Sequence, residues 1–125
     1  MKILFCGLGS IGQRHVRNIR LLFGKKYDII AYRKIGSQKQ ITDKLNLDKK
    51  TNIEEKFDIE VFDDLDQALS EKPEMCFICN PTSLHLETAI KAAAAGCHLF
   101  IEKPVSHNLK NINQLTSFVD EKNLI

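Results

Sequence analysis

Three glycines directly follow the first apolar run, at a spacing that lets a backbone approach a diphosphate. They belong to the stretch Gly7-Leu8-Gly9-Ser10-Ile11-Gly12. Between a strand and a helix, Gly7 would allow the sharp turn, Gly9 would leave room for the pyrophosphate, and Gly12 would let the helix pack closely. The N–H groups at the helix start, those of Ser10, Ile11 and Gly12, would then face the phosphates. The alternative is a structural turn without a ligand, but three glycines in these roles favour a dinucleotide site.

Two polar segments follow later apolar runs, Asn80-Pro81 and Glu102-Lys103-Pro104. In a parallel sheet both would lie at the carboxyl edge of the strands, where such sheets bind ligands. A Glu102–Lys103 pair is costly to bury and is not needed for a turn, so it is a candidate site. A surface ion pair before a proline explains these two residues about equally well, and the pair alone leaves both interpretations open.

The residues that would distinguish NAD from NADP come at the end of the second apolar run. A carboxylate there binds the ribose hydroxyls of NAD, but the sequence has Arg33 and Lys34, with Ser37 nearby. Two cations suit a 2′-phosphate by charge and by bidentate geometry, which favours NADP over NAD. The alternative is that Arg33 and Lys34 only begin a solvated polar loop.

Short apolar runs alternate with helical patterns, which predicts an α/β fold with a Rossmann-type, doubly wound parallel sheet. We predict strands over residues 3–6, 28–32, 59–62, 75–79 and 99–101. We predict helices over residues 10–23, 63–69, 82–95 and 109–119, with Thr82 or Ser83 capping the third. Gly12 shares a helical face with Val16, Ile19 and Phe23, and this face should pack on the sheet. The polar, Lys-rich residues 35–56 are expected to form a weak helix and a solvated loop.

Cysteine spacing and charge exclude several classes of protein. Cys76 and Cys79 have the spacing of a zinc or redox site, but residues i and i+3 of a strand point to opposite faces. Because no second pair supplies further ligands, we expect four buried thiols and no metal. The net charge of +2 is scattered over 125 residues, which argues against nucleic-acid and membrane partners. The first apolar run is too short for a secretory leader, so we expect a cytoplasmic protein.

In their order along the chain, these motifs resemble the oxidoreductases typified by glucose–fructose oxidoreductase, inositol 2-dehydrogenase and MocA. The resemblance covers nearly the whole chain and depends on the glycine loop with His15, Asn80-Pro81-Thr82-Ser83-x-His85, Ala95-Gly96-x-His98 and Glu102-Lys103-Pro104. It implies hydride transfer between NAD(P) and a hydroxyl of a sugar, cyclitol or similar polyol. It also implies that Lys103 hydrogen-bonds the reacting oxygen and assists its proton transfer.

The same resemblance implies roles for the residues around Lys103. Glu102 would contact the ribose on the nicotinamide side, and the Lys103-Pro104 peptide is a candidate for the cis isomer. No nucleophile lies at a suitable spacing from any histidine, so a hydrolytic triad has no support. His15, on the first predicted helix, is expected to be packed or solvated. The residues implied to line the cofactor cleft are Asn80, Pro81, Thr82 and His85.

Members of this family carry a second α/β domain that supplies the substrate pocket and further catalytic groups. We therefore expect residues 1–125 to be an NAD(P)-binding domain, truncated before a sixth strand at Leu124-Ile125 and inactive as this chain alone. The alternative is a stand-alone dinucleotide-binding module, such as a sensor or a partner subunit. An uncovered sheet edge and apolar face would favour self-association, so we expect a homo-oligomer.

Overall fold

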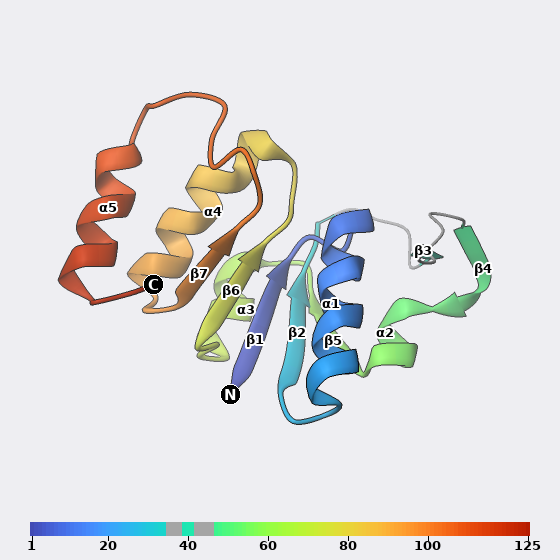
Figure 1. The fold of residues 1–125 in the computed structure, drawn as a ribbon. Helices are drawn as coiled ribbons and strands as arrows, with labels where there is room; N and C mark the ends of the chain where they lie inside the picture. Colours follow the sequence, from blue (N-terminus) through green and yellow to red (C-terminus); the bar gives the residue numbers. More distant parts are fainter. Residues whose placement is uncertain (35–38, 42–46) are drawn as a thin grey trace.

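The computed structural model describes residues 1–34, 39–41 and 47–125, with side chains described outside residues 35–51. The strands are β1 (Lys2–Cys6), β2 (Asp28–Tyr32), β3 (Lys39–Ile41), β4 (Leu47–Asn52), β5 (Ile59–Phe62), β6 (Met75–Ile78) and β7 (His98–Ile101). The helices are α1 (Ser10–Phe23), α2 (Ile53–Phe57), α3 (Leu65–Ser70), α4 (Thr82–Ala94) and α5 (Ile112–Glu121). Helices lie on both sides of one sheet (Figure 1).

Five parallel strands form this sheet in the order β5-β2-β1-β6-β7. The central strand β1 pairs with β2 from Lys2↔Asp28 to Cys6↔Tyr32, and with β6 on its other side. The chain therefore winds outward from β1 in both directions, which is the doubly wound arrangement predicted from the sequence. Because the strands are parallel, their carboxyl ends meet at one edge, the upper one in Figure 1.

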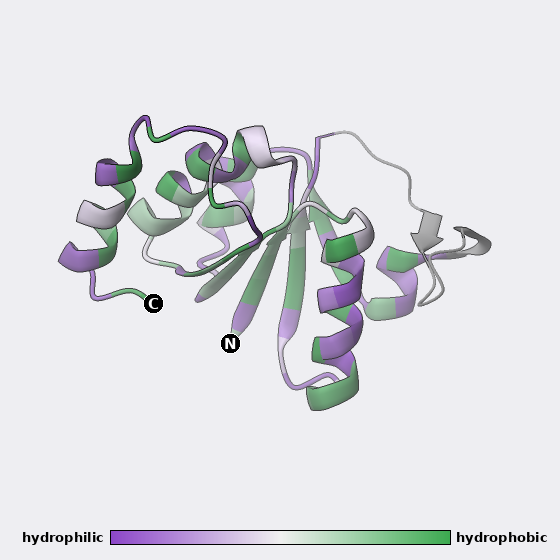
Figure 2. Ribbon diagram, turned by 45° about the horizontal axis from the view of Figure 1, so that its top comes forward, coloured by the Kyte–Doolittle hydropathy of each residue, from purple (hydrophilic) through white to green (hydrophobic). Residues whose placement is uncertain are grey.

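Alternate residues of β1 face two different layers of helices. Ile3 and Phe5 belong to the core on the side of α1 and α2, which includes Val16 and Ile53. Leu4 and Cys6 belong to the core on the side of α3, α4 and α5. Figure 2 shows the strands as mostly hydrophobic between helices of mixed character. Burial on both faces explains why the apolar run 3–6 has no polar alternation.

Most predicted elements are confirmed, and α1, β2 and β5 have the predicted bounds. The expectation that Phe23 packs on the sheet is wrong, since this side chain is 46% exposed and lies edge-on against Tyr27. The buried residues of α1 end at Ile19, so its last turn lies beyond the contact with the sheet. Helix α5 begins at Ile112 and not at Leu109, whose side chain is exposed in the preceding loop.

The polar segment after β2 differs from its prediction within the residues that the structure describes. Strands β3 and β4 pair antiparallel, and α2 follows with Asn52 as its N-cap, whose Oδ1 accepts the N–H of Glu54 at 3.0 Å. A helix of five residues is too short to produce a periodic signal, and the pairing of two separate strands leaves no local signature. Residues 35–38 and 42–46, which include Ser37, lie outside the described residues.

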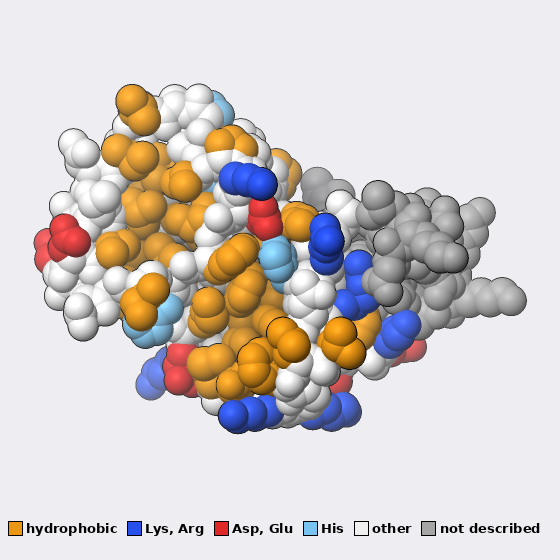
Figure 3. Space-filling view, viewed as in Figure 1, with side chains coloured by type: hydrophobic (Ala, Val, Ile, Leu, Met, Phe, Trp, Pro, Cys, Tyr) orange, Lys and Arg blue, Asp and Glu red, His pale blue; other side chains and the backbone are white. Residues whose placement is uncertain are grey.

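Hydrophobic side chains gather on the sheet face beside α1 (Figure 3). Phe5, Phe77 and Phe100 stack across three neighbouring strands, with ring centroids 4.8 Å apart in each pair. Phe100 remains 38% exposed at the end of this row, and self-association through this face stays a prediction. Past α5, the carbonyl of Ile125 accepts the N–H of Leu99 in β7 at 2.7 Å. Residue 125 therefore lies beside β7. The sixth strand that the sequence predicts for this parallel sheet stays a prediction.

Candidate functional site

The loop after β1 touches the loop after β6 at the carboxyl edge of the sheet. Gly7 has a φ of +100°, and a Cβ at this position would lie 2.8 Å from the backbone nitrogen of Asn80. The N–H of Gly7 also donates to the carbonyl of Tyr32 at 2.9 Å, which ties the loop to β2. Both the backbone conformation and the close approach require glycine at this position.

Gly12 is buried in the first turn of α1, and a Cβ there would lie 2.2 Å from the carbonyl oxygen of Gly7. The next side-chain atom is Cβ of Cys79, at 3.5 Å. Gly12 thus has the close-packing role that the sequence predicts. Its nearest neighbours, however, are residues just beyond β1 and β6, not residues of the strands themselves.

Gly9 differs from the other two glycines because a Cβ built on it would meet no atom within 4 Å. It is the N-cap of α1 and has extended backbone, and no side chain caps the helix. The first turn also contains no acidic residue that would occupy the N–H groups. Open space beside uncapped N–H groups at a helix start fits the diphosphate of a dinucleotide. The predicted group is therefore compatible with the residues Gly9, Ser10, Ile11 and Gly12.

Helix α4 begins at the same edge, and the prediction that Thr82 or Ser83 caps it is wrong. Pro81 occupies the N-cap position, and its side chain has no oxygen that could accept an N–H of the first turn. The carbonyl of Pro81 accepts the N–H of Leu84 at 2.8 Å. The side chain of Asn80 donates through Nδ2 to Oγ1 of Thr88 at 2.9 Å. Its Oδ1 is buried and has no hydrogen-bond partner among the described residues. A buried acceptor of this kind needs an explanation, and a ligand donor nearby is one.

His85 joins the two polar segments that the sequence singled out. Its ring is 2% exposed, with Nε2 2.7 Å from the carbonyl oxygen of Asn80 and Nδ1 2.9 Å from that of Pro104. The two ring nitrogens therefore lie within hydrogen-bond distance of two backbone carbonyls, one in each loop. The peptide between Lys103 and Pro104 is cis, as predicted. The segments after β6 and β7 are therefore assembled at one place.

Glu102 continues from β7, and its N–H donates to the carbonyl of Ile78 at 3.0 Å. Its Oε1 lies 2.7 Å from Nε2 of His15 on α1, with both side chains less than one-fifth exposed. This hydrogen bond is the main reason why the pKa of Glu102 lies below its ordinary value. Lys103 is exposed beside this pair. His15 is therefore packed, as expected, but it also makes a polar contact that sequence reasoning missed.

The predicted NADP-selecting residues follow β2, but Arg33 already has a partner. Its guanidinium forms an ion pair with Glu54 of α2, with the two side chains 12% and 18% exposed, and burial lowers its pKa. Lys34 is exposed. Sequence reasoning missed Glu54 because the segment that contains it showed no recognisable pattern.

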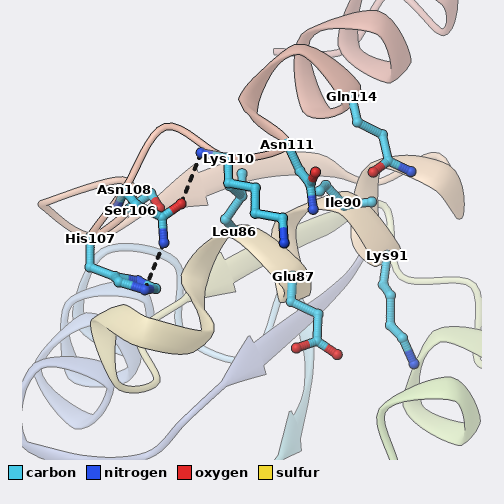
Figure 4. Close-up of a pocket in the computed structure, with 10 residues that line it drawn as sticks. All are labelled: Leu86, Glu87, Ile90, Lys91, Ser106, His107, Asn108, Lys110, Asn111 and Gln114. Carbon is cyan, nitrogen blue, oxygen red and sulfur yellow. Dashed lines mark hydrogen bonds between the residues drawn. The ribbon is translucent and has the colours of Figure 1, made fainter.

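Two hollows lined by described residues flank the site. One of about 700 Å³ begins at Ser10 and runs between α1 and α2, where Arg14, Arg17 and Lys56 give it a positive lining that would attract phosphates. The other, of about 360 Å³, lies between α4 and the loop leading to α5 and includes His107 (Figure 4). None of the predicted cofactor residues lines the second hollow.

The four cysteines are free and buried, as expected. Burial raises the pKa of Cys79 to about 12 and that of Cys97 to about 11, which keeps these thiols uncharged. Among the described residues, no group of three or more His, Cys, Asp or Glu side chains could hold a metal ion. Within the same part of the chain, every helix is too short or too polar to cross a membrane.

Comparison with known proteins agrees with this geometry. Residues 1–125 match the family described as "Oxidoreductase family, NAD-binding Rossmann fold", whose model carries the names of glucose–fructose oxidoreductase, inositol dehydrogenase and MocA. The myo-inositol 2-dehydrogenase of Thermotoga maritima is 31% identical over 117 residues, which cover 92% of this chain and 31% of that protein. The chain thus spans about a third of the length of the curated relatives it matches.

Solved structures show the same fold. The myo-inositol 2-dehydrogenase of Lactobacillus plantarum has a TM-score of 0.76 at 22% identity, over 100% of this chain and 34% of that one. The scyllo-inositol dehydrogenase of Lactobacillus casei, solved with bound NAD(H) and scyllo-inositol, has a TM-score of 0.74 at 24% identity, over 99% of this chain and 34% of that one. The chain therefore belongs to the oxidoreductase family of glucose–fructose oxidoreductase, inositol 2-dehydrogenase and MocA, in which it forms an NAD-binding Rossmann domain.

Proposed function

We propose that this domain binds a nicotinamide dinucleotide along its carboxyl edge and contributes Lys103 to the oxidation of a hydroxyl group on a cyclitol, sugar or similar polyol. One observation carries the proposal: the uncapped start of α1, with open space at Gly9, lies at the same edge as the Glu102-Lys103-Pro104 segment. The substrate class is supported by the relatives reported above, three of which are named as inositol dehydrogenases.

The residues divide into groups that would hold the dinucleotide and a group that would move a proton. The N–H groups of Ser10, Ile11 and Gly12 would bind the diphosphate, and Glu102 would accept from the ribose on the nicotinamide side. A bound nicotinamide ring would supply the hydride acceptor or donor. Lys103 would take the hydroxyl proton on Nζ during oxidation and return it during reduction. The cleft between these groups would be lined by Asn80, Pro81, Thr82 and His85.

The NADP preference remains part of this proposal, and it depends on Lys34 more than on Arg33. Lys34 is exposed beyond β2, whereas the charge of Arg33 is balanced by Glu54. A 2′-phosphate would meet Lys34 and Arg33, but it would also meet the repulsion of the Glu54 carboxylate. Competing titrations with NADH and NADPH decide between the two coenzymes, and tighter binding of NADH would contradict the preference.

The binding proposal is tested by titrating the chain with NADH and following nicotinamide fluorescence. We expect Gly9→Val to weaken binding by about tenfold or more, because losing a hydrogen bond to a charged group costs about 1.5–3 kcal/mol. Its thermal midpoint should change little, since the new side chain meets no protein atom near its Cβ. The proposal would be contradicted if the wild-type chain did not bind NADH at millimolar concentration, or if the variant bound NADH as tightly as wild type.

The catalytic proposal needs the enzyme that contains this segment together with a substrate-binding domain. We expect Lys103→Met to lower kcat by about 10²–10⁴-fold, the usual contribution of a proton-transfer group. The Kd for NADH should stay within a few-fold of wild type. The 125-residue chain alone should show no steady NADH oxidation with any ketose or cyclitol ketone, because nothing described would hold a substrate against the nicotinamide. Turnover by this chain would overturn that expectation.

A further inference from the structure

His15 connects the first turns of α1 with the end of β7. Its Nε2 lies 2.7 Å from Oε1 of Glu102, and the carboxylate only accepts, so the ring donates. The other carboxylate oxygen, Oε2, accepts the backbone N–H of Lys103 at 3.3 Å. One carboxylate therefore joins the imidazole of His15 to the peptide that carries the Lys103 side chain.

Packing holds the His15 ring in the orientation that this hydrogen bond requires. The ring centroid lies 5.6 Å from that of Phe77 and 5.0 Å from that of Phe100, the latter in an edge-on arrangement. Both rings belong to the aromatic row that crosses the sheet. With only 19% of the His15 side chain exposed, the ring has little freedom to turn away from Glu102.

The residues on either side of Lys103 are thus held by histidines from two different helices. His85 of α4 contacts the carbonyl of Pro104, and His15 of α1 contacts the carboxylate of Glu102. We infer that His15 is a positioning residue, which sets the place of Lys103 through Glu102 relative to the helix start that receives the diphosphate. This inference rests on the proposed function for its effect on the coenzyme, but the contact itself is independent of any ligand.

Two substitutions separate the hydrogen bond from the packing. His15→Gln keeps an amide N–H near the place of Nε2 but removes the aromatic ring, whereas His15→Phe keeps the ring and removes the donor. Three measurements on the 125-residue chain compare them with wild type: the amide resonance of Lys103, the carboxyl titration of Glu102 by ¹³C NMR, and the Kd for NADH.

A positioning role predicts that His15→Gln resembles wild type, with a Kd within about threefold. It predicts that His15→Phe moves the Lys103 resonance, makes Glu102 titrate at higher pH, and weakens NADH binding about tenfold. The reverse order, or equal behaviour of the two folded variants, would overturn the inference and leave His15 a packing residue. If neither variant folds, ¹⁵N NMR of wild-type His15 tests the contact. A hydrogen-bonded proton on Nε2 supports the inference, and an unprotonated Nε2 overturns it. The NMR measurements need no dinucleotide, so a chain that does not bind NADH contradicts the proposed function and not this contact.

Discussion

The two edges of the sheet satisfy their charges in different ways. At the amino edge, Lys2 pairs with Glu71 at 2.7 Å and Lys25 with Asp58 at 3.2 Å, and the second pair is more than 70% exposed. At the carboxyl edge, Glu102 and Arg33 pair with partners on helices, and all four side chains are less than one-fifth exposed. The starts of α1 and α4, which carry no side-chain caps, also lie at this edge.

In this respect the amino edge is an ordinary solvated surface, whereas the carboxyl edge has features that suit the binding of a ligand. Exposed pairs such as those of the amino edge are screened by water and contribute little to stability. Buried pairs impose a desolvation cost. At the carboxyl edge they lie near two helix starts without side-chain caps and near the buried Oδ1 of Asn80, which has no hydrogen-bond partner among the described residues. We therefore expect substitutions at the carboxyl edge to change ligand binding, and substitutions at the amino edge to change almost nothing.

The largest effect is expected from Gly12→Ala, because the new Cβ would lie 2.2 Å from a backbone oxygen that cannot move without shifting the loop. We expect it to lower the free energy of unfolding by about 3 kcal/mol and to abolish NADH binding. Gly9→Ala is the matched control in the same loop and should cost less than about 1 kcal/mol. Chemical denaturation measures both, and equal stabilities would show that the loop does not pack as described.

A smaller effect is expected at the buried pair of Arg33 and Glu54, beside which the 2′-phosphate of NADPH is proposed to bind. Glu54→Gln removes the negative charge beside Arg33, so the affinity for NADPH should rise relative to NADH by about tenfold, equivalent to about 1.4 kcal/mol. Glu55→Gln changes an exposed carboxylate on the same helix and should leave the ratio unchanged. Paired fluorescence titrations give the ratio, and an unchanged value in Glu54→Gln would mean that a 2′-phosphate does not approach Arg33.

A modest, pH-dependent effect should follow from the low pKa of Glu102. A carboxyl group whose pKa is lower in the folded than in the unfolded chain stabilises the fold above the unfolded value, and this stabilisation is lost as the pH falls through the folded value. The ordinary value is 4.5, and the hydrogen bond from His15 is the main cause of the lowering. Wild type should therefore exceed Glu102→Gln in stability above about pH 5, with the difference shrinking below about pH 4. A difference that stays constant from neutral to acid pH would exclude this effect.

The smallest effect is expected at the amino edge. Lys25→Gln breaks an exposed pair with Asp58 and should change the free energy of unfolding by no more than about 0.5 kcal/mol. The Kd for NADH should be unchanged, because Lys25 lies at the opposite end of the strands. A loss of binding in this variant would remove the distinction between the two edges.

Much of the fold was predictable because its signals are local. Apolar runs without alternation marked β1 and β2, and the glycine spacing marked the turn into α1. Errors arose where a local signal was absent or ambiguous. The five-residue helix α2 has no periodicity to detect. Thr82 and Ser83 are both good capping residues by type, so the sequence could not reveal that Pro81 would occupy the N-cap.

By itself, the sequence determined the alternation of strands and helices, the glycine loop, and the placement of Asn80 and Glu102 at the ends of strands. These depend on neighbours a few residues apart, for which periodicity and backbone preference are sufficient. Only the tertiary structure decided that His15 meets Glu102, 87 residues away, and that Glu54 neutralises Arg33. Such contacts exist only after the crossovers have brought separate strands and helices together, so no local preference of the chain encodes them.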